Sequence, residues 1–354
     1  MASQDKGLLK ILNEHFGWNK ARMTCFACLL LSLIKVRTVN LVKLSCGFDS
    51  PAKLSSRYQR IKRFFSGYTI DFSQVAIWMV NLFGLGNESL YISMDRTNWR
   101  WGKQDINIFM LSIVYKGIAL PLLWTLLEKR GNSDTSERID LMKRLIDQLG
   151  KERIAGILAD REFVGAQWFA WLRQEKMAFC IRIKKNTLTV DRRGKEIHVD
   201  SLFRNVKVDE QRVLSGTRRI WKEAVYLSAL RLSDGDLLMV ATDHEMKDPI
   251  AHYAKRWQIE TLFGCLKSKG FHFEDTHIVQ PERISKLIAL LAMAFAWAHK
   301  VGEWRNETTP IPIKKHGRKA QSWFPYGLDY FQELLLNPNR HTQRQLNSMI
   351  QLLN

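Results

Sequence analysis

The first 88 residues repeat apolar positions at intervals of three to four residues, which is the spacing of one face of an α-helix. No alternating strand pattern interrupts this segment. The apolar positions are Leu8, Ile11, Leu12 and Phe16, the run at residues 29–34, and Val75, Trp78, Met79 and Leu82. The sequence therefore predicts a helical N-terminal domain over residues 1–88.

The pattern changes at residue 89, where short runs of β-branched, aromatic and aliphatic residues alternate with glycine and polar turns. Three such runs, over residues 90–94, 106–115 and 118–124, predict three adjacent strands. After them come a predicted helix over 137–149, a strand over 154–159, a helix over 166–175 and a strand over 178–183. The order βββαβαβ predicts a mixed α/β core.

Residues from about 186 to 245 alternate polar and apolar positions with repeated turns, and they predict a β-rich insertion. Two long helices are predicted next, over residues 249–269 and 282–304. The predicted core therefore spans residues 89–304. Residues 305–354 form a C-terminal region to which the sequence assigns no role.

The charge of the chain points to an anionic partner. It carries 54 lysines and arginines against 35 aspartates and glutamates, a formal net charge of +19. A hydrophobic share of 46% and a charged share of 25% exclude a disordered tail, a collagen-like fibre and a low-complexity scaffold. Nucleic acid is the first candidate partner for such a basic globular protein.

The cysteines and the apolar runs predict a location. The five cysteines are odd in number and lie in apolar surroundings, which indicates reduced thiols and a cytosolic compartment. Cys25 and Cys28 lack a second pair at zinc-finger spacing, which favours core packing over zinc. The longest apolar run, residues 110–127, is interrupted by lysine, glycine and proline, and no secretory signal is visible. We expect no membrane association.

Acidic residues follow two of the predicted core strands. Asp95 comes directly after residues 90–94, and Asp160 comes directly after residues 154–159. A single Asp in such a place often only caps a helix or begins a turn. Clustered carboxylates, in contrast, need a compensating cation, because like charges at close range raise one another's pKa. Mg²⁺ suits this role, since it prefers oxygen ligands and is commonly shared with substrate phosphate.

A third acid, Glu260, lies on the predicted helix over residues 249–269. At about 100° per residue, four polar side chains fall within one narrow sector of that helix: Tyr253, Arg256, Glu260 and Lys267. The apolar side chains lie across the axis or flank this stripe: Ile259, Leu262, Leu266, Trp257 and Phe263. The pattern favours a metal ligand between phosphate-binding cations over a salt-bridged surface helix.

Other residues compete for these roles. Asp243 follows an apolar strand and Glu162 lies two residues after Asp160, so both are rival metal ligands. A turn containing His272 and His277 is interpreted as a polar turn in preference to a zinc site. Two tryptophans that follow Asp95 are either packing or DNA-facing aromatics: Trp99 and Trp101.

One N-terminal helix is both basic and amphipathic. Over residues 55–65, four cations alternate with aromatic and aliphatic residues: Arg57, Arg60, Lys62 and Arg63. Contact with DNA phosphates and an ordinary solvated face over a buried Ile-Phe stripe are equally supported interpretations.

The polar stripe and the two Asp motifs together resemble bacterial transposases of the insertion-sequence-four family. The pattern Tyr-x2-Arg-x3-Glu-x6-Lys ends at Lys267, and it is preceded by Ser-Met-Asp95-Arg-Thr-Asn-Trp and by Leu-Ala-Asp160-Arg-Glu-Phe. The resemblance covers roughly residues 50–304, with the motifs in family order. The helix signature is specific, whereas the two Asp motifs alone are not.

This resemblance implies a fold and a set of roles. It implies an RNase H-like catalytic core of the DDE type with a β-rich insertion, preceded by a helical DNA-binding domain and followed by C-terminal helices. Asp95, Asp160 and Glu260 would be catalytic and would hold two Mg²⁺ ions, which Mn²⁺ can replace. Tyr253, Arg256 and Lys267 would bind DNA near the cut.

The same resemblance implies cut-and-paste transposition of an insertion sequence. The partners would be transposon-end DNA, target DNA and a second copy of the chain in a DNA-bound homodimer, in the bacterial cytoplasm at the nucleoid. Related enzymes flip a base onto an aromatic side chain, and Trp221 is the candidate here, against a sheet-core tryptophan as the simpler interpretation. The alternative functions are a non-catalytic DNA-binding relic and a nuclease of the same fold without strand transfer.

Overall fold

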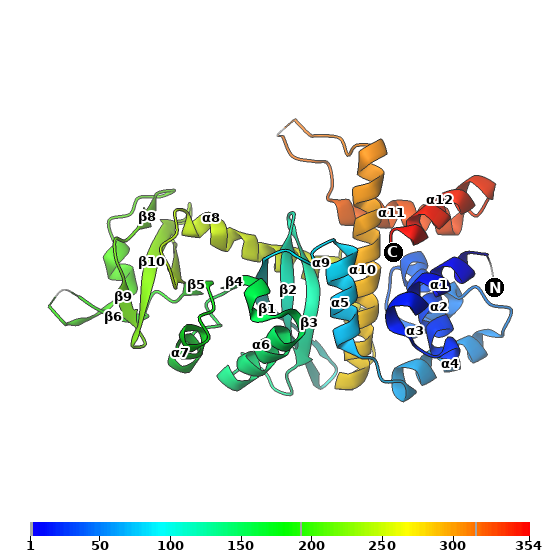
Figure 1. The fold of residues 1–354 in the computed structure, drawn as a ribbon, viewed down its shortest axis with the longest axis horizontal. Helices are drawn as coiled ribbons and strands as arrows, with labels where there is room; N and C mark the ends of the chain where they lie inside the picture. The colour runs from blue at the N-terminus through cyan, green and yellow to red at the C-terminus, as the bar shows by residue number, and fades with distance from the viewer. Residues whose placement is uncertain (1–2, 192, 316) are drawn as a thin grey trace. The chain divides into compact units, whose positions relative to one another are not determined.

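The computed structural model describes residues 3–191, 193–315 and 317–354. The chain divides into two compact units (Figure 1). The helical unit consists of Met1–Gly86, Trp99–Ile106 and Leu262–Asn354, and the sheet unit of Asn87–Asn98 and Asn107–Thr261. The predicted domains over 1–88, 89–304 and 305–354 divide the chain differently, because the helices after residue 262 join the N-terminal helices in one unit. The functional roles of those domains stay predictions.

The described N-terminal part of the helical unit is helical, as the apolar spacing predicts, and it consists of α1 (Ser3–Phe16), α2 (Lys20–Val36), α3 (Leu41–Gly47), α4 (Leu54–Gly67) and α5 (Phe72–Leu82). Side-chain caps define where several of them begin. Asn19 caps α2 by accepting a hydrogen bond from the backbone N–H of Arg22, and Asn40 caps α3 in the same way. α2 ends at Arg37, whose φ of 51° turns the chain out of the helix.

The core of the helical unit is α10 (Pro281–Thr308), which contacts α2, α4, α5 and most extensively α11 (Trp323–Leu336). Figure 1 shows α10 in orange running beside α5. α10 is long and apolar enough to cross a membrane, but 89% of its apolar window is buried inside the protein. The bent pair of α2 and α3 is also long and apolar enough to cross a membrane, by length and composition only. A helix that is apolar all round and buried in this way is typical of a protein core.

Two glycines let α10 and α11 approach closely. A Cβ added at Gly302 would lie 1.9 Å from the carbonyl oxygen of Trp323, and one at Gly327 would lie 1.9 Å from that of Ala298. Neither backbone can shift without separating the helices, so a larger residue at either position would break this packing. The chain ends in α12 (Arg340–Gln351), which packs against α1 and α11.

The sheet unit is built on one mixed sheet, as the alternation of strands and helices predicts (Figure 1). Its strand order is β3-β2-β1-β4-β5-β11-β10-β8, and β9 pairs with β10. The strands from the predicted core are β1 (Leu90–Trp101), β2 (Gln104–Tyr115), β3 (Ile118–Leu126), β4 (Ile154–Ala159) and β5 (Phe179–Ile183). Parallel pairing joins β1 to β4 and β4 to β5. The connecting helices α6 (Thr135–Leu149) and α7 (Ala166–Gln174) contact each other.

The predicted insertion is β-rich, but much of it belongs to the central sheet. β6 (Leu188–Val190) and β7 (Glu196–His198) form a separate two-stranded sheet, followed by β8 (Gln211–Val213) and β9 (Arg218–Ile220). β11 (Leu237–Thr242) instead pairs with β5, and β10 (Glu223–Arg231) pairs with β11. All six residues of β11 are buried, and a strand with no polar face is stable only between neighbours within a sheet.

The long helix predicted over residues 249–269 is broken and shorter than predicted. It consists of α8 (Pro249–Ala254), a 3₁₀ turn over Lys255–Trp257, and α9 (Gln258–Leu266). The tighter turn contains Arg256, whose side chain contacts Asp95 as described below. A 3₁₀ segment inside a helix changes the direction of its side chains, and such segments are frequent at functional positions.

Candidate active site

Asp95 and Asp160 lie on neighbouring strands of the sheet. β1 and β4 run parallel, and Met94 pairs with Ala159. Asp95 is the next residue along β1, and Asp160 is the first residue after β4. Because the strands are parallel and in register at this point, both carboxylates emerge at the same level of the sheet. The predicted adjacency of these two acids is therefore present.

Two side chains from the segment after β11 bind both acids. The Tyr253 hydroxyl donates a hydrogen bond to Oδ1 of Asp160 at 3.2 Å and accepts one from Nε of Arg256 at 3.1 Å. Arg256 Nη1 donates to Oδ2 of Asp95 at 2.9 Å, and its Nη2 forms an ion pair with Glu260. One guanidinium and one phenol thus connect the three acids that the sequence singled out.

The side chains of this cluster differ strongly in exposure. The Arg256 side chain is 3% exposed and that of Asp95 16%, whereas Asp160 is 29% and Glu260 55% exposed. Arg182 adds a more distant cation, 3.8 Å from Oδ1 of Asp160. The cluster therefore has a dry side at Asp95 and Arg256 and a solvent-facing side at Glu260.

Burial and neighbouring charges shift the pKa values of Asp95, Arg256 and Tyr253. Desolvation raises the pKa of Asp95 to about 6, although Arg256 and the Arg96 N–H oppose the shift, and Glu162 and Glu260 add to it. Burial alone would lower the pKa of Arg256, but Tyr253, Asp95 and Glu260 outweigh it and raise that pKa. Burial also raises the pKa of Tyr253, so its phenol stays protonated and can donate to Asp160.

The prediction that the Tyr-Arg-Glu-Lys stripe is displayed to solvent is wrong for its first two members. Tyr253 is 1% and Arg256 3% exposed, because both side chains point onto the strand ends instead of away from the protein. The apolar side behaves as predicted, since Ile259, Leu262 and Leu266 are all buried. The break at Lys255–Trp257 means that ideal α-helical spacing no longer relates these residues.

The donor chemistry of the strand ends fits a hard divalent cation. Asp95 and Asp160 supply oxygen ligands, and burial raises the pKa of Asp95, so a bound cation would favour its ionised form. In the described part of the chain, however, no group of three or more His, Cys, Asp or Glu side chains is arranged to hold a metal ion. Arg256 instead lies against Asp95 and Glu260, where it supplies the positive charge.

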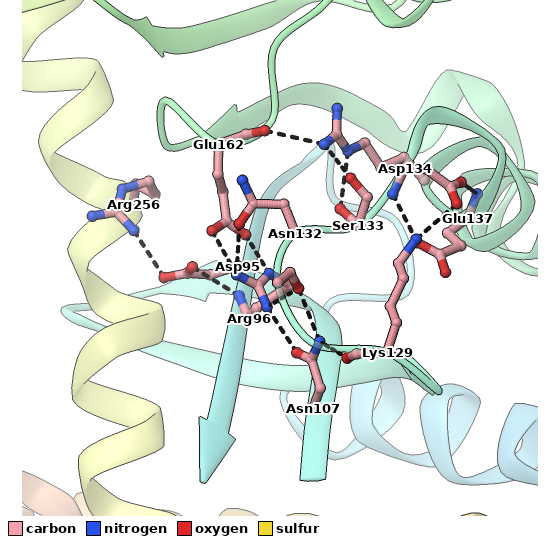
Figure 2. A network of polar contacts seen from close by, with 12 residues as sticks. Asp95, Arg96, Asn107, Lys129, Asn132, Ser133, Asp134, Glu137, Glu162 and Arg256 are labelled. Carbon is pink, nitrogen blue, oxygen red and sulfur yellow. Dashed lines mark hydrogen bonds and ion pairs between the residues drawn. The ribbon is translucent and has the colours of Figure 1, made fainter. Parts of the chain in front are cut away.

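A second arginine, Arg96, connects β1 to the loop after β4 through Glu162 (Figure 2). Its Nε and Nη2 donate to the two carboxylate oxygens of Glu162 at 2.7 and 3.0 Å. The remaining donors reach Oδ1 of Asn107 at 2.8 Å, the carbonyl of Gly131 at 2.6 Å and Oδ1 of Asn132 at 2.9 Å. Its backbone N–H donates to Asp95 Oδ1 at 2.8 Å. Every guanidinium donor of Arg96 is therefore used.

This network changes the interpretation of Glu162. Both of its carboxylate oxygens accept hydrogen bonds from Arg96, so in this structure Glu162 is an ion-pair partner of Arg96. Arg138 extends the network by donating to the carbonyls of Glu162 at 3.0 Å and Val164 at 3.2 Å. It thereby connects the start of α6 to the loop after β4.

Sequence reasoning missed the supporting residues of this network. Arg96 directly follows Asp95, and Asn107 and Asn132 lie on or after the neighbouring strands, but single polar residues in such places give no recognisable pattern. The one available signal was the nearness of Arg96 and Glu162 to the two predicted catalytic acids. Their pairing depends on β1 and β4 being neighbours, which the order of residues does not state.

The other rival acid has a structural role. Oδ1 of Asp243 accepts a hydrogen bond from the backbone N–H of Phe179 at 2.8 Å and lies 3.0 Å from His244 Nδ1. It therefore fixes the start of β5 against the end of β11. No contact connects it to Asp95 or Asp160 among the hydrogen bonds of the described residues.

Lys267 and the tryptophans near the turn at 272–277 belong to the helical unit. Lys267 forms an ion pair with Glu274 at 2.8 Å and lies over the ring of Trp99, with 5.2 Å from its Nζ to the ring centroid. Trp99 packs edge-on against Phe273, and the exposed Trp101 stacks on His277. His272 and His277 are both exposed in this turn, and His277 is held by its stacking on Trp101.

Trp221 lies at a strained turn between β9 and β10. Trp221 and Lys222 have φ values of 51° and 73°, a left-handed conformation that usually requires glycine or asparagine. The Trp221 ring packs edge-on against Phe169 at 4.9 Å and is half-buried, so it is not a sheet-core tryptophan. With Lys184, Arg219 and Lys222 it lines a cavity of about 540 Å³. Strained backbone of this kind is frequent at functional positions.

The four cations of the basic helix α4 differ in their environments. Arg57 donates to the carbonyls of Ala52 at 2.8 Å and Phe48 at 3.1 Å, which holds the turn before the helix. Arg60 is half-buried beside the thiol of Cys25. Lys62 and Arg63 are exposed, while the Ile-Phe stripe of the same helix is buried, as predicted.

Comparison with known proteins places the chain in a family. The sequence profile described as "Transposase DDE domain" matches residues 87–297, which is more than half of the chain. A search of curated proteins finds no match. A cryo-EM structure of a piggyBac transposase synaptic complex with hairpin DNA aligns with a TM-score of 0.47 and 12% identity, over 94% of this chain and 76% of that chain. That structural likeness is too distant to indicate function. The profile match, which includes Asp95, Asp160 and Glu260, shows that this chain belongs to the transposase DDE domain family.

Proposed function

We propose that the protein cuts DNA at the ends of an insertion sequence and joins those ends to target DNA, by the cut-and-paste route of the insertion-sequence-four transposases. Membership of the transposase DDE domain family supports the general activity. The observation that carries the proposal is the parallel pairing of β1 with β4, which brings Asp95 beside Asp160. Arg256 connects this pair to Glu260. An RNase H-like arrangement of the core is part of the proposal.

Asp95, Asp160 and Glu260 are the residues that would hold two Mg²⁺ ions, or Mn²⁺ in their place. When bound, such ions activate an attacking oxygen and stabilise the leaving oxygen of a phosphodiester. Holding them requires Asp95 to be ionised, and burial opposes this below about pH 6. Arg256 favours the ionised form, and Tyr253 fixes the orientation of the Asp160 carboxylate.

The basic and aromatic residues around the acids would bind DNA. Arg256 would bind a phosphate oxygen only by exchanging a carboxylate partner, because its buried guanidinium is paired with Asp95 and with the exposed Glu260. Tyr253, deeply buried, acts through Asp160 and Arg256 rather than by exposing its own surface to DNA. Lys267 would contribute positive charge from the helical unit.

The cavity beside Trp221 suits an extruded nucleobase. It combines one aromatic ring with three cations, Lys184, Arg219 and Lys222, against a single carboxylate, Glu196. A base needs a stacking surface, and its phosphate needs net positive charge. This supports a role for Trp221 in excision through a DNA hairpin. A DNA-bound homodimer is part of the same proposal and follows from the family resemblance alone.

The decisive experiment mixes the protein with a linear DNA that carries the inverted repeats flanking its gene, with Mg²⁺ and a circular target. Joined products support transposition. Nicks without joining would favour a nuclease, and binding without any cut would favour the non-catalytic relic. The intact cluster of three carboxylates around Arg256 favours an active enzyme over the relic.

A further inference from the structure

Arg256 is bound to two of the acids that the proposed function assigns to metal ions. Its Nη1 donates to Oδ2 of Asp95 at 2.9 Å (Figure 2), and its Nη2 forms an ion pair with Glu260. The other carboxylate oxygen of Asp95 accepts the backbone N–H of Arg96 at 2.8 Å. Each oxygen of Asp95 therefore already has a hydrogen-bond donor.

The same guanidinium keeps Glu260 apart from the other two acids. Among the described residues, no hydrogen bond or ion pair joins Glu260 to Asp95 or Asp160, and no group of three His, Cys, Asp or Glu side chains is arranged to hold a metal ion. A guanidinium and a divalent cation on the same two carboxylates would repel each other at short range. Pairing with Arg256 and binding of a metal ion by all three acids are therefore alternatives.

The two arms of Arg256 differ in how easily they exchange a partner. The Arg256 side chain is 3% exposed, and its Nε is fixed by the Tyr253 hydroxyl at 3.1 Å. The Asp95 side chain is 16% exposed, whereas that of Glu260 is 55% exposed. A buried pair is costly to break, but an ion pair with an exposed partner contributes little. The Glu260 arm is therefore the one that a competing anion can take.

We propose that Arg256 competes with the metal ions for Asp95 and Glu260, and that a phosphate of bound DNA relieves this competition by replacing Glu260 on Nη2. A phosphate oxygen suits that arm, because guanidinium groups form strong charge-assisted hydrogen bonds with phosphate. Glu260 is then free to join Asp95 and Asp160. The affinity for metal thus depends on DNA, and by linkage the affinity for DNA depends on metal. The inference rests on the proposed function, which supplies both ligands.

The first test needs no DNA. Binding of Mn²⁺ to the full-length protein is followed by the electron paramagnetic resonance signal of the free hydrated ion. Arg256→Gln removes the competitor and should tighten Mn²⁺ binding by about tenfold, a usual size for coupling between two ligands. Arg256→Lys should give a smaller gain, because one ammonium lacks the planar fork that reaches both carboxylates.

Two outcomes of this test would overturn the proposal. One is an Arg256→Gln protein that melts cooperatively and binds Mn²⁺ no more tightly than wild type. The other applies where Arg256→Gln does not fold, and it is the absence of any gain in Arg256→Lys.

Two further variants serve as matched controls. Arg182→Gln removes a cation that lies 3.8 Å from Oδ1 of Asp160, and it should tighten Mn²⁺ binding much less than Arg256→Gln. An equal gain would contradict the proposal, since total charge near the acids would then explain the effect. Glu260→Gln should leave Mn²⁺ binding without DNA nearly unchanged, because Arg256 already holds that carboxylate. A large loss would show that Glu260 binds the ion without DNA, against the proposal.

The second test adds a duplex that carries an already cut element end, with the Mn²⁺ bound by the duplex alone subtracted. The duplex should raise the Mn²⁺ affinity of wild type. This rise should be much smaller in Arg256→Gln, where no competitor remains to be displaced, and in Glu260→Gln, where no carboxylate is released. A rise of equal size in wild type and Arg256→Gln would refute displacement by phosphate.

The outcomes distinguish this inference from the proposed function. If Arg256→Gln tightens Mn²⁺ binding and the duplex raises the affinity of wild type, but wild type never cuts or joins DNA, the competition stands and the transposase proposal fails. If wild type joins element ends to target DNA while Arg256→Gln binds Mn²⁺ no more tightly, only the competition fails.

Discussion

Arg96 and Glu162 form a two-pronged ion pair, with Nε to Oε1 at 2.7 Å and Nη2 to Oε2 at 3.0 Å (Figure 2). Each partner lies one or two residues from a candidate catalytic acid, so the pair fixes the middle of β1 against the loop after β4. The side chains are 10% and 22% exposed. A fork of this geometry sets orientation as well as distance, which a single surface ion pair does not do.

The first prediction concerns this pair. Arg96→Lys keeps the charge but loses the fork, and Glu162→Gln keeps the shape but loses the charge. Both should reduce the rate of DNA cutting by about a hundredfold, because small displacements of catalytic groups have effects of that size. The DNA concentration for half-maximal rate should change little. Lys129→Gln is the control, since its ion pairs with Asp134 and Glu137 are exposed and contribute little. A proportional loss in the control would contradict a positioning role.

The second prediction concerns the three acids. Asp95→Asn, Asp160→Asn and Glu260→Gln should each abolish cutting, while binding to element-end DNA stays within severalfold of wild type. Amides are preferable to alanine here, because an alanine at 95 would leave the buried Arg256 guanidinium with an empty space beside it. Cutting by any of the three amide variants at the wild-type rate would remove that residue from the catalytic set.

The third prediction concerns Arg256. Arg256→Gln leaves the Asp95 carboxylate buried without its cation, and breaking such a pair typically costs about 3 kcal/mol of unfolding free energy. Because Arg256 lowers the pKa of Asp95, its removal should raise that pKa above about 6 and move the acidic limb of the pH–rate profile upward. Arg256→Lys should shift the profile less. Chemical denaturation and single-turnover cutting measure the two effects separately.

The fourth prediction follows from the raised pKa of Asp95. The unfolded carboxyl ionises near 3.8 and the folded one near 6, so the native state binds one more proton between these values. The unfolding free energy of the metal-free protein should therefore fall as pH rises through this window, by about 3 kcal/mol. The unfolding free energy of the Asp95→Asn variant should not fall over this pH window. Denaturant melts of both proteins from pH 4 to pH 6.5 give the comparison, and parallel curves would contradict the assignment.

The fifth prediction concerns Trp221. Trp221→Ala removes the aromatic face of the cavity and should weaken binding to hairpin DNA by about tenfold, since stacking contributes about 1–3 kcal/mol per base. Trp221→Phe keeps an aromatic face and should retain most of the affinity. Fluorescence of a 2-aminopurine placed at the hairpin tip reports the stacking. An equal loss in both variants would indicate that only the packing against Phe169 matters.

The sequence by itself determined those features of the protein that depend on the local spacing of apolar and polar residues. The spacing of apolar residues predicts that the N-terminal region is helical, and the change to β-rich runs predicts the mixed core, because side-chain burial repeats with the period of each element. Asp95 and Asp160 are visible for the same reason, since each follows an apolar run, but β1 continues past Asp95 to Trp101, so only Asp160 lies at a strand end.

Only the tertiary structure decided which of these residues come into contact with one another. The sequence shows Arg256 and Tyr253 on a polar stripe, but only the packing of the segment after β11 onto the strand ends turns both inward onto Asp95 and Asp160. Likewise, Arg96 and Glu162 become partners because β1 and β4 are neighbours, although 66 residues separate them. Such contacts are set by which apolar faces bury one another, and no local spacing encodes that choice.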